Sequence, residues 1–306
     1  MLTKLDTLSD VSSSDSDSKD TQKDAKTLAR VKRKFSKRKF FDGETDMIED
    51  KTMQKWWKRR YDLFWRFDEG IKIDKESWYS VTPETIARRQ ADVCSCDVVV
   101  DVCCGIGGNS IAFTRTCPIV ISIDNSMEKL DILSYNSQIY GVRKSIDLIC
   151  SDASYSMLMF RPDIIDIVFI SPPWGGPGYS NLQLPPGSAS WNKKFNRKRS
   201  IKDLNQKSSE LEAAFGLDHI PFLVKFFESA RIVAKDICAY LPRNSSIGQI
   251  LKLGWPIEDS DIAYSNIVSV IDTRKVCLPV LIEDYWLRGR RIALCAYIGD
   301  YFNKVL

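Results

Sequence analysis

The chain has 306 residues, of which 44% are hydrophobic, enough for one large domain or two small ones. Its formal net charge of +4 does not by itself indicate a polyanionic partner, so the distribution of charge matters more than the sum. No apolar run approaches the roughly 20 residues of a membrane span, and Met1 begins no signal-peptide pattern, which predicts no membrane association. The nine cysteines form no CxxC and the one histidine has no ligand spacing, which predicts reduced thiols and no metal.

Residues 1–45 are predicted to form a tail in two parts. Leu8–Asp20 consists largely of serine and aspartate with almost nothing to bury, so we expect it to be disordered. Arg30–Phe41 is densely basic with interleaved phenylalanines. Such a block is typical of a nuclear localisation signal, of an RNA-contacting arm or of a solvated tail, and these readings are not exclusive.

Residues 46–95 are predicted to form a helical extension that closes over the active site. Apolar residues at helical spacing between Met53 and Gly70 indicate a helix that ends at the glycine. Further along, Thr82 is expected as an N-cap, with Pro83 at the first helical position.

From residue 96 to 306 the pattern alternates between strands and helices, which predicts a mostly parallel, doubly wound sheet with right-handed crossovers. The expected strands are Val98–Val102, Ile119–Ile123, Ile146–Cys150, Ile167–Ile170, Ile237–Leu241 and Ile292–Ile298. The expected helices are Gly107–Thr116, Ser126–Tyr140 and Ile220–Ala234. Two segments, at about 181–209 and 273–291, are interpreted as insertions, the first of them polar and basic.

A strand, an acid and a glycine-rich turn follow one another in VVVDVCCGIGGNS, residues Val98–Ser110. The spacing D-x-x-x-G-x-G-G differs from the GxGxxG of a dinucleotide site, and Asp101 suits an ammonium group better than a diphosphate. The next strands end at Asp124, placed for ribose hydroxyls, and at Asp152, placed for an adenine amino group. One such acid could be only a helix cap or turn former. Together they fit S-adenosylmethionine and predict a Rossmann-like class I methyltransferase with a small helical N-terminal extension.

The fourth predicted strand runs into SPPWGGPGY, where the prolines must end the strand. This run resembles the [DNS]-PP-[YFW] signature of enzymes that methylate exocyclic amines of nucleobases. Such an amine is a poor nucleophile because its lone pair is delocalised, and acceptors aimed at its N–H groups draw it towards a tetrahedral nitrogen. The Ser171 oxygen and the Pro172 carbonyl can supply those acceptors. Trp174 can stack on the base, and tryptophan is the best face for a cationic ring such as 7-methylguanine. The alternative is that Trp174 is a core aromatic.

These motifs together resemble one family. SPPWGGPGY, DVCCGIGGN and the segment Arg59–Glu84 are similar to trimethylguanosine synthases, over about residues 54–243 and the last strand. That family converts the 7-methylguanosine cap of small nuclear and nucleolar RNAs to 2,2,7-trimethylguanosine. Members usually have an acid where this chain has Gly178, and the basic segment at 181–209 is longer than the family needs. We expect that segment to add electrostatic grip on RNA.

The resemblance also implies roles for individual residues. Ser171, Pro172 and Trp174 would form the catalytic set. The residues implied for cofactor binding are Phe64, Thr82, Asp101, Gly105, Asp124, Asp152 and Ala153. Those implied for binding the cap are Lys55, Ser80, Asn136, Trp174, Tyr179 and Arg243. Within the second set, Ser80 would lie opposite Trp174 and Asn136 would read the guanine edge. Lys55, Tyr179 and Arg243 would hold the phosphates. Core packing is the alternative for Phe64, and ordinary surface charge is the alternative for Lys55 and Arg243.

Two other functions remain open. An adenine-N6 or ribosomal guanine-N2 methyltransferase would use the same chemistry without requiring a prior 7-methyl group. A catalytically silent cap-binding module would bind 7-methylguanosine through Trp174 but would not bind S-adenosylmethionine, and the acids Asp101 and Asp124 argue against it. By resemblance we expect a monomer acting on capped snRNA or snoRNA, with RNP proteins delivering the substrate. We expect it in the nucleus, in nucleoli or nuclear bodies, with the cytoplasm as a further location.

Overall fold

A computed structural model describes residues 53–161, 164–174, 216–256 and 275–306. Its centre is a seven-stranded sheet in the order β3-β2-β1-β4-β5-β7-β6. The strands are β1 (Val98–Val102), β2 (Ile119–Asp124), β3 (Ile146–Cys150), β4 (Ile167–Ile170), β5 (Asp236–Pro242), β6 (Val280–Leu287) and β7 (Arg290–Ile298). The first five strands pair in parallel, whereas β7 is antiparallel to both β5 and β6. This is the Rossmann-like class I methyltransferase arrangement that the sequence predicts.

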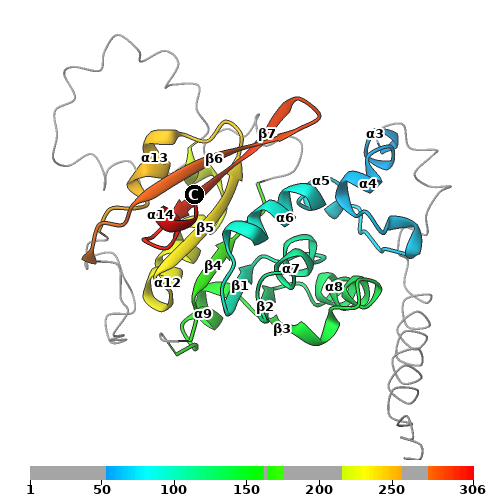
Figure 1. Ribbon diagram of the computed structural model, residues 1–306, viewed down its shortest axis with the longest axis horizontal. Coiled ribbons are helices and arrows are strands. Elements are labelled where there is room, and N and C mark those ends of the chain that lie inside the picture. The colour runs from blue at the N-terminus through cyan, green and yellow to red at the C-terminus, as the bar shows by residue number, and fades with distance from the viewer. Residues whose placement is uncertain (1–52, 162–163, 175–215, 257–274) are drawn as a thin grey trace, which may run out of the picture. The chain divides into compact units, whose positions relative to one another are not determined.

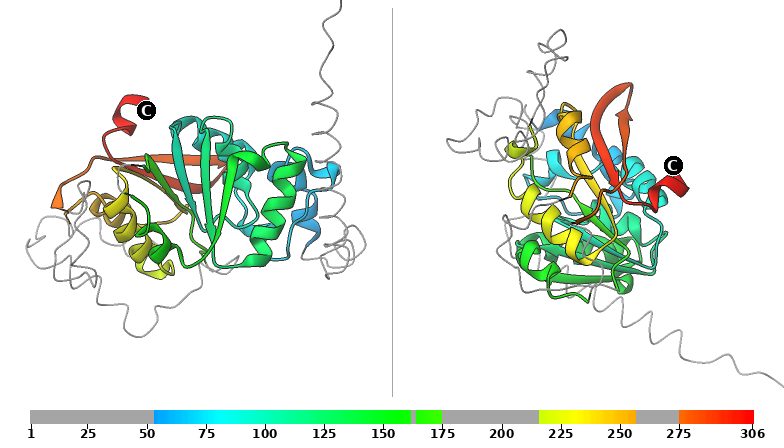
Figure 2. Two further views of the ribbon diagram at one scale, coloured as in Figure 1. Left: turned by 90° about the horizontal axis from the view of Figure 1, so that it is seen from below. Right: turned by 90° about the vertical axis from the view of Figure 1, so that its left-hand side faces the viewer.

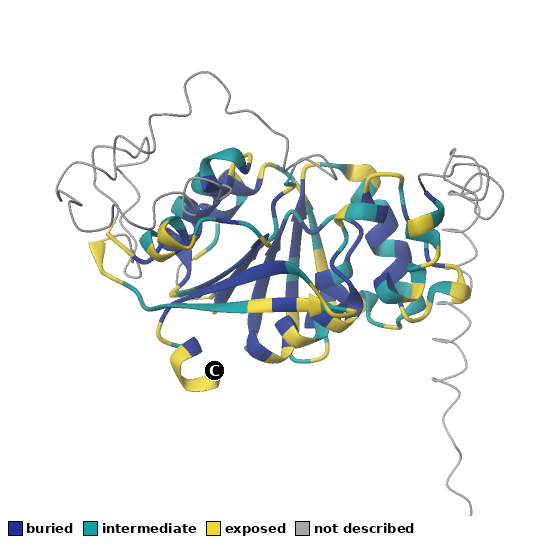
Figure 3. Cartoon of the chain, turned by 90° about the horizontal axis from the view of Figure 1, so that it is seen from above, coloured by how far each residue is buried: buried dark blue, intermediate teal, exposed yellow. Residues whose placement is uncertain are grey.

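The central strands β1 and β4 are buried along their whole length, as Figure 3 shows for the middle of the sheet. Their apolar runs leave no polar face, which is the pattern of strands covered by helices on both sides. Val98, Val100 and Val102 pack in one core cluster, on one face of the sheet. Asp101 alternates to the other face, where its carboxylate meets Ser110 of the following helix.

Two groups of helices cover the sheet. The helices α6 (Glu84–Val93), α7 (Gly108–Phe113) and α8 (Met127–Ile139) lie to the right of the sheet in Figure 1, and α9 (Ala153–Met157), α12 (Leu223–Val233) and α13 (Ile247–Lys252) lie to the left. Figure 2 shows the same elements from two further sides. Short helical turns outside the N-terminal extension are η2 (Arg143–Ser145), η4 (Leu217–His219) and α14 (Phe302–Val305). No helix in the described ranges combines the length and apolarity needed to cross a membrane.

The start of the extension is a series of short turns and not the single helix expected up to Gly70. Its elements are α3 (Gln54–Trp57), α4 (Arg60–Leu63), η1 (Phe67–Glu69) and α5 (Ser77–Ser80). Gly70, at φ 100°, does end η1 in the left-handed conformation that glycine favours. The expected cap is one residue off, because α6 begins at Glu84 with Pro83 in the N-cap position and no side-chain cap bond.

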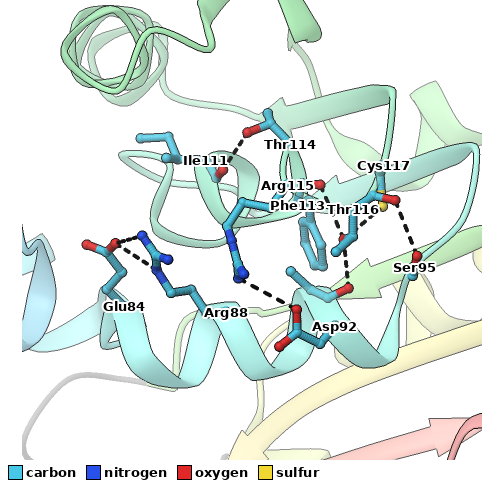
Figure 4. Close-up of polar contacts among 11 residues, drawn as sticks. Glu84, Arg88, Asp92, Ser95, Ile111, Phe113, Thr114, Arg115, Thr116 and Cys117 are labelled. Atoms are coloured by element: carbon cyan, nitrogen blue, oxygen red, sulfur yellow. Dashed lines mark hydrogen bonds and ion pairs between the residues drawn. The ribbon is translucent and has the colours of Figure 1, made fainter.

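Helix α6 joins the extension to the core through ion pairs and hydrogen bonds, several of which Figure 4 shows. Glu84 accepts two hydrogen bonds from Arg88 on the next turn, at 3.0 and 2.8 Å. Asp92 lies 3.6 Å from Arg115, and the Thr116 hydroxyl donates to the Ala91 carbonyl at 2.8 Å. The end of α7 is thereby fixed against α6.

The structure corrects one expectation for residues 273–291. Within that segment Val280–Leu287 form β6, which pairs with β7 as the edge strand of the sheet and so belongs to the core fold. This strand carries the acids Glu283 and Asp284, which are typical of an edge strand, where charged side chains discourage pairing with other chains. The tail at 1–45 and the basic segment at 181–209 lie outside the described residues.

Candidate active site

A cavity of about 590 Å³ lies at the carboxyl ends of β1 to β4, and residues of the N-terminal extension form part of its wall. Its walls include Gly105 of the glycine turn, Asp124 and Asp152 from the two following strand ends, and Trp174 from the SPPW run. In an open α/β sheet this edge, outside the strand carboxyl ends, is where ligands bind.

The glycine turn is shaped by backbone conformations that favour glycine. Gly105 and Gly107 have φ values of 55° and 94°. A Cβ on Gly107 would lie 2.6 Å from the Leu133 Cγ, and one on Gly108 would lie 2.7 Å from the Val81 Cγ2. The turn therefore needs glycine for conformation at Gly105 and for close packing at Gly107 and Gly108. Gly108 brings the turn against the extension.

Asp101 lies directly behind this turn. It is fully buried, its Oδ2 accepts a 2.5 Å hydrogen bond from the Ser110 hydroxyl, and its Oδ1 has no hydrogen-bond partner among the described residues. Burial, added to by the nearby Asp124, raises the pKa of Asp101 to about 7 despite the bond from Ser110. An ammonium group close to Asp101 would give the unpaired oxygen a partner and favour the carboxylate. The acid thus fits the amino group of S-adenosylmethionine.

Asp124 and Asp152 are both in the cavity wall but are held differently. Asp124 accepts hydrogen bonds from the Gly105 and Ser126 amides, both at 2.9 Å, so two backbone groups fix its carboxylate. Asp152 is the N-cap of α9 and accepts from the Ser154 amide at 2.8 Å. Partial burial opposes ionisation of Asp152, but the hydrogen bonds from Ser154 and the charge of Lys225 lower its pKa overall. The cap interpretation and the binding interpretation of Asp152 therefore coexist.

The SPPW run carries the chain from β4 into the cavity wall, and the structure describes it as far as Trp174. The Ser171 amide still donates to the Val102 carbonyl at 3.2 Å, which extends the register of β4 with β1 by one residue. The Trp174 indole Nε1 donates to the Tyr240 carbonyl at 3.3 Å, and the two rings lie 5.2 Å apart. Trp174 is half-buried with part of its surface in the cavity that Gly105 also lines, so the tryptophan and the glycine turn share one space.

The extension covers this space with residues 78–83, which include Ser80 and Thr82. Lys129 of α8 forms a 2.8 Å ion pair with Glu76, and both residues line the cavity. The cover is also held by a buried amide. The Lys72 amide donates to the Asn136 Oδ1, and the Asn136 Nδ2 donates to the Lys72 carbonyl, both at 2.9 Å.

The structure brings most of the predicted site residues to the cavity: Ser80, Thr82, Gly105, Asp124, Asp152, Ala153, Ser171, Pro172 and Trp174. It does not bring Asp101 or Asn136 there, since Asp101 is fully buried behind the glycine turn and is not part of the cavity wall. Asn136 is fully buried and also donates to the Ile106 carbonyl at 3.4 Å, so its amide is used for bracing and not for reading guanine. Phe64 is likewise buried in a second hollow of about 270 Å³, beside Tyr140, which fits its core-packing alternative.

The predicted phosphate-binding residues give a mixed result. Lys55 is exposed, with its Nζ 5.2 Å from the centre of the Trp56 ring, and Trp56 lines the cavity. Arg243 is exposed at the end of β5 and does not line the cavity. Tyr179 lies outside the described residues.

Sequence reasoning missed several residues in the cavity wall: Trp56, Arg59, Trp78, Tyr79, Phe222, Phe226, Tyr240 and Ile292. The clustering of aromatic residues in the extension could have indicated Trp56, Trp78 and Tyr79. Phe222 gave no such signal, since its left-handed backbone at φ 61° and its 63% exposure become visible only in the structure.

Comparisons with known proteins identify the family of this chain. The chain is 36% identical over 211 residues to the trimethylguanosine synthase of Schizosaccharomyces pombe, covering 67% of this chain and 76% of that protein. It is 32% identical over 206 residues to the trimethylguanosine synthase of Saccharomyces cerevisiae, covering 64% of this chain and 56% of that protein. A solved structure of a precorrin-6y C5,15-methyltransferase from Geobacter metallireducens GS-15 aligns with a TM-score of 0.42 at 10% identity, over 76% of this chain and 95% of that one. The RNA cap guanine-N2 methyltransferase model matches residues 96–301, and this chain therefore belongs to that enzyme family.

Proposed function

We propose that this cap guanine-N2 methyltransferase uses S-adenosylmethionine to convert the 7-methylguanosine cap of snRNA- and snoRNA-type transcripts to 2,2,7-trimethylguanosine. One observation carries the proposal, namely that Trp174 and the Gly105 turn line the same cavity. A base stacked on the indole and a donor held at the turn would therefore face one another. Monomeric action, delivery of substrate by RNP proteins and a nuclear location are part of the same proposal.

The donor fits the residues at the strand ends. Asp101 would pair with its amino group, Asp124 would accept from its ribose hydroxyls, and the Asp152–Ala153 edge would face its adenine. The unpaired Oδ1 of Asp101 is the specific feature of this structure that such a cation would satisfy. When bound, S-adenosylmethionine supplies an electrophilic methyl group.

The protein's own contribution is to position and polarise the guanine amine. Trp174 would hold the cationic ring by stacking, an attraction of about 0.5–2 kcal/mol. The Ser171 hydroxyl oxygen and the Pro172 carbonyl would accept hydrogen bonds from the two N–H groups of the guanine amine. These bonds would direct the lone pair of the amine nitrogen into the cavity. Proline rigidity keeps these acceptors in place. Such positioning contributes up to about 7–11 kcal/mol of barrier reduction, and no strong base is needed because the amine becomes acidic once it is methylated.

The test separates the two halves of the site. Trp174→Ala should abolish methylation of a 7-methylated cap dinucleotide while the affinity for S-adenosylhomocysteine persists, and Asp124→Ala should weaken that affinity while cap binding is nearly kept. Calorimetry measures both ligands, and mass spectrometry of the cap measures the product. Methylation of an unmethylated GpppG at the same rate would reject the 7-methyl requirement. Loss of both ligands in either variant would reject the assignment of roles.

A further inference from the structure

The hairpin formed by β6 and β7 carries an exposed group of aromatic and basic residues that the proposed reaction does not use. Figures 1 and 2 show this hairpin projecting beyond the rest of the sheet. Trp286 is 59% exposed near its tip, and the side chain of Arg288, in the turn, is 65% exposed. Arg290 follows as the first residue of β7 and is also exposed.

The turn itself is unusual in its chemistry. Leu287 pairs with Arg290, so Arg288 and Gly289 form a two-residue turn, and their φ values are 50° and 73°. Hairpin turns with both φ values positive favour asparagine followed by glycine, because a side chain with a branched or long stem is disfavoured there. An asparagine would suit the backbone of the first position better than arginine does. The backbone therefore gives no reason for a guanidinium at this tip.

Arg288 reaches across to the N-terminal extension. One of its guanidinium nitrogens lies 2.9 Å from the Asp62 Oδ1, and the Arg59 Nε lies 3.3 Å from the Asp62 Oδ2. A single carboxylate thus faces two guanidinium groups, while Arg290 forms no ion pair with any described residue. The other charges of the hairpin balance, because Arg291 pairs with Asp284 and Arg89 with Glu283. The tip therefore keeps an excess of positive charge.

The tip is continuous with the wall of the cavity. Arg59 lines the cavity, and the Arg59 guanidinium lies 5.7 Å from the centre of the Trp56 ring, which lines it too. On β7, Ile292 is an extra residue between two register pairs, Tyr285 with Ala293 and Trp286 with Arg291. Bulges of this kind re-aim side chains next to active sites, and Ile292 lines the cavity. From Ile292 to Arg290, the first residue of β7, the strand covers about 7 Å.

We propose that Trp286 and Arg288 of the hairpin tip, together with Arg59, bind the nucleotides that follow the methylated cap. This inference rests on the proposed function, since it takes the substrate to be capped RNA. Guanidinium groups pair with phosphate oxygens, and the Asp62 carboxylate leaves one of its two arginines available for such a contact. Trp286 offers an exposed face on which a base of any identity can stack, as single-stranded nucleic acid sites require. An acidic protein would satisfy the arginines but would have no use for the indole face.

The experiment compares a capped oligoribonucleotide, the same uncapped oligoribonucleotide and a cap dinucleotide, all on the full chain. Each phosphate contact to a single strand adds about 0.7 to the slope of log affinity against log salt. Arg288→Asn should therefore lower the slope for both oligonucleotides by about 0.7, and Arg288→Lys should keep it. Trp286→Ala should weaken oligonucleotide binding about fivefold or more with the slope retained. Arg115→Asn is the matched control. It removes an exposed arginine that follows α7 and that, like Arg288, pairs with a single carboxylate, here that of Asp92.

The melting temperature provides a readout that separates binding from folding. Because asparagine suits the turn, Arg288→Asn should melt at the wild-type temperature or above while its slope falls. Three results would overturn the proposal. The first is an unchanged salt slope in Arg288→Asn, and the second is an equal loss of affinity for the dinucleotide and the oligonucleotides. The third is that polyglutamate competes for binding as well as RNA does. Failure of the proposed function looks different, since the wild type would then not methylate the dinucleotide. The slopes for uncapped RNA would still test the surface.

Discussion

The role of Asn136 provides the sharpest test of this structure, because the family resemblance and the geometry disagree about it. By resemblance its amide reads the guanine edge, whereas the structure buries it completely and bonds it to the Lys72 amide and carbonyl and to the Ile106 carbonyl. Asn136→Ala would leave these three backbone groups without their partner. A buried group left unpaired costs about 1–3 kcal/mol, and Lys72 is only half-buried, so water can replace part of what is lost. We expect a loss of about 2–4 kcal/mol.

That loss should be visible as a fall in the melting temperature, at about 2–4 °C for each kcal/mol in a chain of this size. Thermal melts followed by circular dichroism measure it, and calorimetry measures the affinity for a cap dinucleotide in the protein that remains folded. Gln138→Ala is the control, since it lies on the same helix and its side chain forms no hydrogen bond to any described residue. A variant that melts like the wild type but loses more than about tenfold in cap affinity would refute the bracing role and restore the guanine-reading one.

Two further predictions concern Asp101 and Gly108, behind and within the glycine turn. Burial raises the pKa of Asp101 to about 7, so the folded chain holds this proton more tightly than the unfolded chain does. The stability gained from the proton is complete below about pH 4 and is lost as the pH rises through about 7, and melts should show that Asp101→Asn removes this dependence. Gly108→Ala would place a Cβ 2.7 Å from the Val81 Cγ2 and 3.3 Å from the Thr82 carbonyl, which should cost about 1–3 kcal/mol and weaken binding of S-adenosylhomocysteine. Gly248→Ala, where the nearest contact would be 4.0 Å, should be neutral in the same assays, and equal effects of the two changes would contradict the close-packing argument.

The sheet could be predicted because its signals are local. Val98–Val102 and Ile167–Ile170 are short apolar runs, and each ends at residues that cannot continue a strand. The acids at the strand tips follow from the same pattern, because the carboxyl ends of parallel strands share one edge of a sheet. β6 was missed for the converse reason. An edge strand carries charges and an exposed tryptophan, so its sequence does not look like a core element.

The extension could be predicted only in part, because its structure depends on contacts with distant residues. Asn136 lies 64 residues from Lys72, and the spacing of apolar residues along either segment gives no indication that they meet. Phe64 sits on an apolar stripe that fits both a core position and a lid over the cofactor. Only its burial beside Tyr140 distinguishes these. A motif therefore identified the family, but a motif cannot tell a residue that touches the ligand from one that holds the wall.

This distinction bears on how the two ligands communicate. The extension is held to the core by Asn136, by the Lys129–Glu76 ion pair and by Glu84, which accepts from the Tyr140 hydroxyl at 2.5 Å. The same extension supplies Thr82 beside the glycine turn and Arg59 beside the hairpin. A change that loosens it should therefore lower the affinities for both donor and RNA together. A change confined to Asp124 or to Trp174 should affect one ligand alone. Joint losses without a fall in stability are the result that this architecture does not allow.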